Sequence, residues 1–194
     1  DFYVAPTARG SGNGSSSANA ALWTDATFWN NVQTAVQSAD TTVWFTDGNY
    51  SEGNLVLTRR GHTSNWLTLQ GQTPEGAILD APVATMMSLA ACTRVRLKHL
   101  HWRGNGTGYG LTITKSGSYI SEHVEVDSCT WKDMPLIYYG AMGAHHGSRY
   151  VSIRNCTFQR IGVGGTAHMI YNAYGPQYLT VENNLFEDCA GDYV

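Results

Sequence analysis

The sequence is poor in charged residues, in long hydrophobic runs and in cysteine spacings that bind zinc. Only 14% of its 194 residues are charged and the net charge is −3, so no basic patch for nucleic acid is predicted. No apolar run approaches the roughly 20 residues that span a bilayer, and a membrane partner is not expected. The four cysteines form no CxxC or Cys/His pattern, so no metal site is predicted. The chain is instead rich in glycine, with 21 residues, and in aromatic residues, at 11%, which is typical of strands joined by tight turns.

A ten-residue phrase occurs four times, at nearly constant intervals. The copies are VRLKHLHWRG from Val95, VEVDSCTWKD from Val124, VSIRNCTFQR from Val151 and LTVENNLFED from Leu179. Apolar residues occupy the first and third places with polar residues between them, which is the pattern of a half-buried strand. One such strand cannot bury its apolar face alone. We therefore expect an all-β solenoid, a right-handed parallel β-helix in which the copies stack as coils.

Equivalent places in the four copies predict what lies inside and outside the stack. The eighth place is always aromatic, which predicts an internal ladder of rings made by Trp102, Trp131, Phe158 and Phe186. The fourth place alternates in charge and predicts ion pairs between coils, on a solvent-facing scaffold, among Lys98, Asp127, Arg154 and Glu182. Cys129 and Cys156 share the sixth place, where their side chains run parallel, so free buried thiols are expected rather than a disulfide.

The same register extends toward the N-terminus. Leu67 precedes Val95 by the interval that separates the copies, and Val43 precedes Leu67 by a somewhat shorter one. The coils are therefore expected over residues 42–194 of a single domain, 1–194. Residues 1–41 should supply a strand, a loop and a capping helix, because 26–39 shows helical spacing of apolar residues after Asp25 or Thr24 as N-cap. Such a helix would cover the open strand edges at this end of the stack.

Four segments resemble a known superfamily. They are FYVAPTARGSGNGSSSANA, TTVWFTDGNYSEGNLVL, VSIRNCTF and LTVENNLF, and they are similar to right-handed parallel β-helix proteins of the pectin lyase-like superfamily, polysaccharide lyase type. The resemblance implies a secreted carbohydrate-active enzyme, extracellular or periplasmic, with a polysaccharide as partner. It does not fix the activity, because the superfamily includes lyases, hydrolases, epimerases, tailspikes and adhesins. No catalytic motif of these relatives matches here residue by residue.

Two segments concentrate aromatic, imidazole and amide groups on consecutive coils, as a glycan groove requires. The segments are PLIYYGAMGAHHGSR from Pro135 and AHMIYNAYGPQ from Ala167. The residues predicted to bind substrate are Tyr138, Tyr139, His145, His146, Asn172 and Tyr174. For catalysis we expect His168 as base, Tyr171 as acid toward the leaving oxygen with Tyr138 as the alternative, and Arg149 as the cation that holds the substrate carboxylate.

These groups favour β-elimination on a uronate polysaccharide, with alternatives left open. Lys115, Lys132 and Arg160 are rival cations, because lyases of the resembled group use Lys or Arg bases, often with calcium. Acidic residues such as Asp133, Asp188 and Asp192 could bind calcium, but no calcium motif is present, so no cofactor is predicted and calcium is left open. Asp133 and Asp188 share the tenth place and would be the carboxylates of a hydrolase, but two coil steps set them about 10 Å apart, slightly long for an inverting pair. The remaining alternative is a glycan-binding or adhesin β-helix without a base.

The last phrase of the chain predicts further coils. NNLFEDC from Asn183 completes a strand and turn, and the residues after it begin another strand. An open coil exposes an edge that natural proteins cover. A C-terminal continuation or a companion chain that completes the β-helix is therefore expected.

Overall fold

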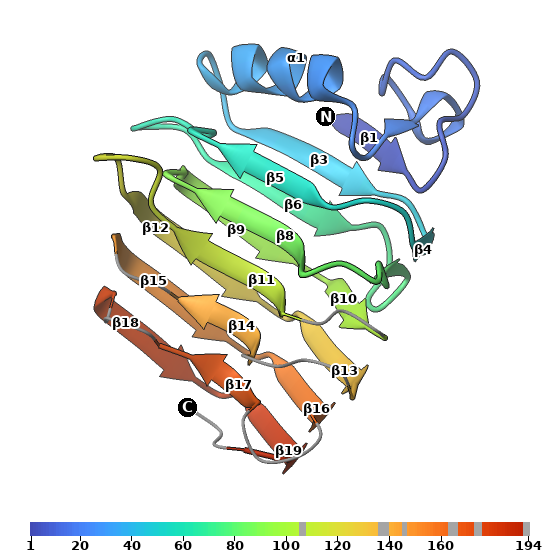
Figure 1. The fold of residues 1–194 in the computed structure, drawn as a ribbon. Helices are drawn as coiled ribbons and strands as arrows, with labels where there is room; N and C mark the ends of the chain where they lie inside the picture. Colours follow the sequence, from blue (N-terminus) through green and yellow to red (C-terminus); the bar gives the residue numbers. More distant parts are fainter. Residues whose placement is uncertain (105–107, 136–139, 145–146, 163–166, 173–175, 192–194) are drawn as a thin grey trace.

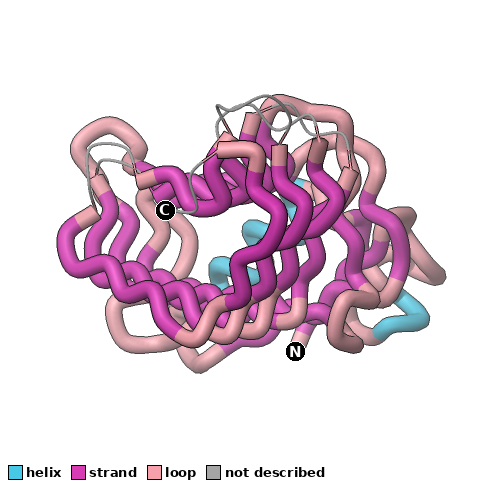
Figure 2. Tube along the Cα trace, turned by 90° about the horizontal axis from the view of Figure 1, so that it is seen from below, coloured by secondary structure: helices cyan, strands magenta, loops and turns pink. Residues whose placement is uncertain are grey.

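The computed structural model describes residues 1–104, 108–135, 140–144, 147–162, 167–172 and 176–191. Its strands form three parallel sheets, and each coil of the chain adds one strand to each sheet in turn (Figure 1). The chain is thus a right-handed parallel β-helix with one helix near its N-terminus, as the repeated phrase predicted. Figure 2, turned by 90°, shows the coils one behind another with the helix at the far end.

Sheet A carries the first half of the repeated phrase. Its strands, in spatial order, are β18 (Gln177–Glu182), β15 (Ser148–Arg154), β12 (Ser121–Asp127), β9 (Thr93–Lys98), β6 (Leu67–Gly71), β3 (Thr41–Phe45), β1 (Phe2–Ala5) and β2 (Ala21–Leu22). Val95, Val124 and Val151 pair directly in this sheet, and all three are fully or almost fully buried. The coils therefore stack in the register that the phrase predicted.

Sheets B and C complete each coil. Sheet B consists of β19 (Leu185–Cys189), β16 (Thr157–Ile161), β13 (Thr130–Met134), β10 (Leu100–Arg103), β7 (Ala77–Leu79) and β4 (Gly48–Tyr50). Sheet C consists of β17 (His168–Tyr171), β14 (Gly140–Ala144), β11 (Tyr109–Thr114), β8 (Thr85–Ala90) and β5 (Leu55–Thr58). Sheet B holds the second half of the phrase, whereas the strands of sheet C share no common sequence.

The predicted aromatic ladder fills the core against sheet B. Ring centroids are 4.5 Å apart between Trp102 and Trp131, 4.7 Å between Trp131 and Phe158, and 5.2 Å between Phe158 and Phe186, with the planes within 11° of parallel. The first three rings are fully buried and Phe186 is partly buried. The ladder is confirmed.

The predicted charge pattern and the free thiols are also confirmed. On sheet A, Lys98 pairs with Asp127 at 3.8 Å and Arg154 pairs with Glu182 at 2.7 Å. Cys129 and Cys156 are buried free thiols, and burial holds the pKa of the Cys129 thiol well above its ordinary value. These features stabilise the scaffold and do not mark a reactive centre.

Two details near the N-terminus correct the sequence analysis. Val43 pairs with Leu69, and Thr41 takes the place opposite Leu67. A shift by two residues keeps the same side chains inside, so alternation alone does not distinguish the two registers. The helix α1 (Ala26–Val36) ends three residues before the predicted Ala39.

The capping helix starts where the sequence predicted. Asp25 is its N-cap, and its carboxylate accepts hydrogen bonds from the amides of Thr27 at 2.7 Å and Phe28 at 3.2 Å. At the other end, the amides of Ser38 and Ala39 both donate to the carbonyl of Ala35, in a turn that ends the helix. The buried face of α1 includes Phe28, Trp29, Val32 and Val36 and packs at the β3 end of the stack (Figure 1). Within the described residues there is no helix with the length and hydropathy to cross a bilayer.

Candidate functional site

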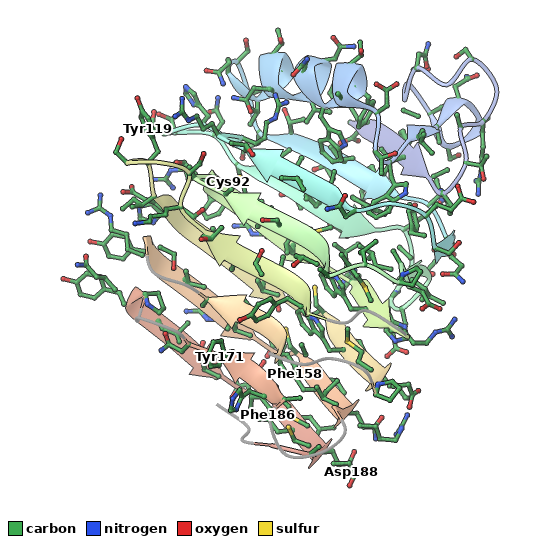
Figure 3. All side chains as sticks on the ribbon, viewed as in Figure 1. Cys92, Tyr119, Phe158, Tyr171, Phe186 and Asp188 are labelled. Carbon is green, nitrogen blue, oxygen red and sulfur yellow. The ribbon has the colours of Figure 1, made fainter. Side chains whose placement is uncertain are left out.

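The outer face of sheet C holds the predicted residues that the structure brings together. Leu111, Met142 and Ile170 pair across β11, β14 and β17 and are fully buried. The residues that follow them therefore occupy the opposite face, with Tyr171 in register with Gly143 and Thr112. Period-two alternation is the reason that Tyr171 is presented on the outside of the fifth coil of the stack (Figure 3).

Three side chains form an aromatic cluster on this face, which we call the sheet C face. The His168 ring stacks on Tyr171 with centroids 5.1 Å apart and planes inclined by 15°. The Tyr171 ring also lies 6.3 Å from the ring of Tyr109, two coils away. Gly140 lies between them in the sheet, and a Cβ at that position would stand 3.1 Å from Tyr171 Cβ. Because Gly140 and Gly143 of the intervening strand carry no side chains, rings from separate coils can meet.

The polar residues around the sheet C face are consistent with an accessible surface. His168, Tyr171 and Tyr109 are each half-buried, and Asn172, directly after β17, is exposed. Thr112 donates its hydroxyl to Ser88 Oγ at 3.0 Å on the neighbouring coils. Imidazole, phenol and amide groups from the third and fifth coils are therefore collected on this face, and these groups recognise sugar hydroxyls and rings.

Arg149, the predicted cation, lies elsewhere. It belongs to β15 of sheet A, where its guanidinium forms an ion pair with Glu122 of β12. The guanidinium carbon is also 5.8 Å from the centre of the Tyr150 ring. The structure therefore places Arg149 on a different sheet from His168 and Tyr171. The other predicted substrate-binding residues, Tyr138, Tyr139, His145, His146 and Tyr174, lie outside the described residues.

The carboxylates considered for hydrolysis are engaged in a charged column on sheet B. Arg160 stands between Asp133 and Asp188 in the stack and donates from Nε to an Asp133 carboxylate oxygen. This hydrogen bond, reinforced by the guanidinium charge, lowers the pKa of Asp133. A general acid needs a raised pKa. Asp133 is therefore suited to an ion pair and not to proton donation. Among the described residues there is no group of three or more His, Cys, Asp or Glu side chains placed to hold a metal ion.

Two surface features escaped the sequence analysis. His123, Tyr150 and Tyr178 stack on the outside of sheet A, with successive centroids 4.8 and 4.9 Å apart. Arg59, Arg60 and His62 gather where sheet C turns into sheet A, so a local basic patch exists despite the negative net charge. The sequence RRGH at residues 59–62 could have indicated the basic patch.

Comparison with solved structures identifies the fold. An alginate lyase of the PL6 family, AlyGC, in a mutant form, superposes with a TM-score of 0.52 at 13% identity over 84% of this chain. The chain has a polysaccharide lyase-like parallel β-helix fold. The PL6 family polysaccharide lyase Pedsa3628 from Pseudopedobacter saltans matches at 16% identity and a TM-score of 0.46, also over 84% of this chain.

The lyase-like β-helix spans only part of these proteins, 28% of the AlyGC chain and 46% of the Pedsa3628 chain. At such low identity the likeness concerns the fold alone. No protein-family model and no curated protein matches the sequence.

Proposed function

We propose that this chain belongs to a secreted enzyme that cleaves a uronate-containing polysaccharide by β-elimination on the sheet C face. The observation that carries the proposal is the contact of His168 with Tyr171 beside Tyr109, an imidazole and two phenols on the outside of sheet C, from coils that are two steps apart. The likeness of the fold to PL6 lyases supports a polysaccharide lyase as the class of enzyme.

Elimination on a uronate needs a base for the proton beside the carboxylate and an acid for the leaving oxygen, both within reach of one sugar ring. His168 is the base that removes the proton from the carbon beside the carboxylate, and the electron pair of that C–H bond becomes the new C=C bond. The C–O bond to the leaving sugar breaks at the same time, and Tyr171 donates its phenolic proton to the leaving oxygen. The stacked arrangement of the two rings, with centroids 5.1 Å apart, sets both groups beside one sugar ring.

The substrate carboxylate also needs a positive partner as negative charge develops on it. Arg149 was the predicted candidate, but it lies on sheet A, where its guanidinium is paired with Glu122. Lys115 follows β11 directly and is exposed where sheet C ends. We therefore favour Lys115 over Arg149 for this role.

A glycan-binding module is the second candidate function. The same aromatic cluster would bind a sugar chain without any proton transfer, since ring stacking and hydroxyl contacts suffice for recognition. Hydrolysis is disfavoured by the ion pair that keeps Asp133 ionised. The lyase needs proton transfer and the glycan-binding module does not, so a test of proton transfer distinguishes the two.

Two variants of the sheet C face test the proposal. Tyr171→Phe keeps the ring and removes the proton donor, and His168→Ala removes the base. We expect each to lower the turnover of a polyuronate by at least about 100-fold, the usual contribution of one acid or base. Tyr171→Phe should leave the dissociation constant of a uronate oligosaccharide within about threefold.

Tyr178→Phe is the matched control, because it removes a phenolic hydroxyl from an exposed ring on sheet A, at 69% exposure. We expect wild-type turnover from this variant. Wild-type turnover in both His168→Ala and Tyr171→Phe would move catalysis to another surface. Oligosaccharide binding by a wild-type protein that forms no product would support the binding module instead.

A further inference from the structure

A cleft lies at the corner where sheet C turns into sheet A, at the N-terminal end of the stack. It has a volume of about 560 Å³ and is bordered by the 59–63 turn on one side and the 118–122 turn on the other. This volume falls within the range of about 300–1,000 Å³ that is usual for small-molecule sites. Figure 3 shows Tyr119 at this corner, well separated from Tyr171 on the sheet C face.

The cleft is lined by cationic donors that lack acidic partners. Arg59 is exposed, and its guanidinium carbon lies 4.0 Å from the centre of the Tyr119 ring. Arg60 donates from Nη2 to Asn30 Oδ1 at 2.8 Å, while its buried Nε has no hydrogen-bond partner within the described ranges. Neither arginine has a carboxylate partner among the described residues. An anion in the cleft would pair with the exposed Arg59 guanidinium and would lie near the charge of Arg60.

His62 adds a third donor. Its Nδ1 lies 3.3 Å from the backbone nitrogens of both Ser64 and Asn65 and accepts their hydrogen bonds. Because Nδ1 accepts, the ring proton is assigned to Nε2, which is therefore a hydrogen-bond donor. The acidic group that lines the cleft is Glu122, whose charge is paired with Arg149. The cleft is therefore electropositive although the chain carries a net charge of −3.

Contacts within the chain hold the cationic turn in place without a ligand. The side-chain amide of Gln33 on α1 donates to the carbonyl of Gly61 at 2.9 Å and accepts from its amide at 3.0 Å. Gly61 has a φ of 96°, and a Cβ there would lie 1.8 Å from the carbonyl oxygen of Thr93, so only glycine fits this crossing of two coils. Tyr119 holds the Arg59 guanidinium by a cation–π contact. Little conformational entropy remains to be lost on binding.

We propose that this corner cleft binds the carboxylate groups of an anionic oligosaccharide, as a second glycan site separate from the sheet C face. Two arginines and a histidine N–H supply the planar, charged donors that suit carboxylates. The cleft is large enough for sugar rings as well as the charged group. The choice of a uronate as the ligand rests on the proposed function. Binding at this site does not itself require that any bond is cleaved.

Calorimetric titration with a uronate hexasaccharide at low salt tests this site, with every protein carrying His168→Ala so that the sugar is not cleaved during the titration. A neutral hexasaccharide and the same hexasaccharide bearing sulfate groups are the other two ligands. Arg59→Gln and His62→Ala remove donors from the cleft, and we expect each to raise the dissociation constant of the uronate about tenfold. Arg154→Gln is the matched control, since it removes one positive charge from a side chain that is 46% exposed on sheet A. Its affinity should stay within twofold of wild type.

Three results would overturn the proposal. Equal weakening by Arg154→Gln would mean that net charge alone attracts the ligand. If the neutral or the sulfated oligosaccharide bound as tightly as the uronate, the cleft would not recognise the carboxylate. Unchanged affinity in both Arg59→Gln and His62→Ala would leave the cleft without a role. Because Arg59 and His62 lie outside the sheet C face, none of these results bears on the turnover losses expected for His168→Ala and Tyr171→Phe.

Discussion

Replacing Trp131 by alanine removes the middle of the aromatic ladder. The ring is fully buried and stacks on Trp102 at 4.5 Å and on Phe158 at 4.7 Å. Buried Trp→Ala changes cost about 3–5 kcal/mol, and each lost stack contributes about 0.5–1.5 kcal/mol of that. The buried indole N–H has no hydrogen-bond partner in the part of the chain that the structure describes, an unfavourable feature that the change removes. We expect the free energy of unfolding to fall by about 4 kcal/mol.

Trp131→Phe separates the two contributions. It keeps a ring between Trp102 and Phe158 and removes the unpaired N–H, so we expect a loss below about 2 kcal/mol. Urea unfolding followed by circular dichroism measures both variants. Tyr178→Ala, at the exposed end of the stack on sheet A, is the control and should cost less than about 1 kcal/mol. A loss of less than about 1 kcal/mol for Trp131→Ala, or equal losses for the alanine and phenylalanine variants, would refute the reasoning.

Two further predictions concern the scaffold. Burial raises the pKa of the Cys92 thiol to about 12 from 9.0, so the folded protein keeps a proton that the unfolded chain releases. The free energy of unfolding should therefore fall as pH rises from about 9 to about 12, by up to ~4 kcal/mol from this thiol, and Cys92→Ala should flatten that slope in urea titrations at several pH values. An unchanged slope would contradict the assignment. Asp25→Ala should cost about 1 kcal/mol by the same assay because it removes the two hydrogen bonds that cap α1, whereas Asp25→Asn should cost less; equal losses would argue against the cap.

The stacking of coils could be predicted from the sequence because sheets A and B repeat one phrase. Places that alternate between apolar and polar fix which side chains lie inside, and a place that is always aromatic fixes a ladder. The register at Val43 was wrong because a shift of two residues satisfies the same alternation. The alternation of apolar and polar residues therefore predicts which face of the sheet a side chain occupies more reliably than which residue it pairs with.

The surface sites were harder to predict because winding brings together residues that are distant in sequence. Tyr109 meets Tyr171 only because Gly140 and Gly143 lie between them in the sheet. Arg59 and Tyr119 belong to different coils, and the corner between sheets C and A joins them. Sheet C has no repeated phrase, so its register could not be read from the sequence. The expectation of further coils or a companion chain stays a prediction.

Product analysis tests the central functional claim most directly. Wild-type protein is incubated with a uronate polysaccharide, and ultraviolet absorbance of the unsaturated product is recorded together with newly formed reducing ends. β-Elimination creates one C=C bond for each new reducing end, so the account predicts that both signals rise in a one-to-one ratio. Reducing ends without ultraviolet absorbance would establish hydrolysis, and the absence of both signals across pectate, alginate and glycosaminoglycan substrates would contradict the claim that this β-helix is a lyase.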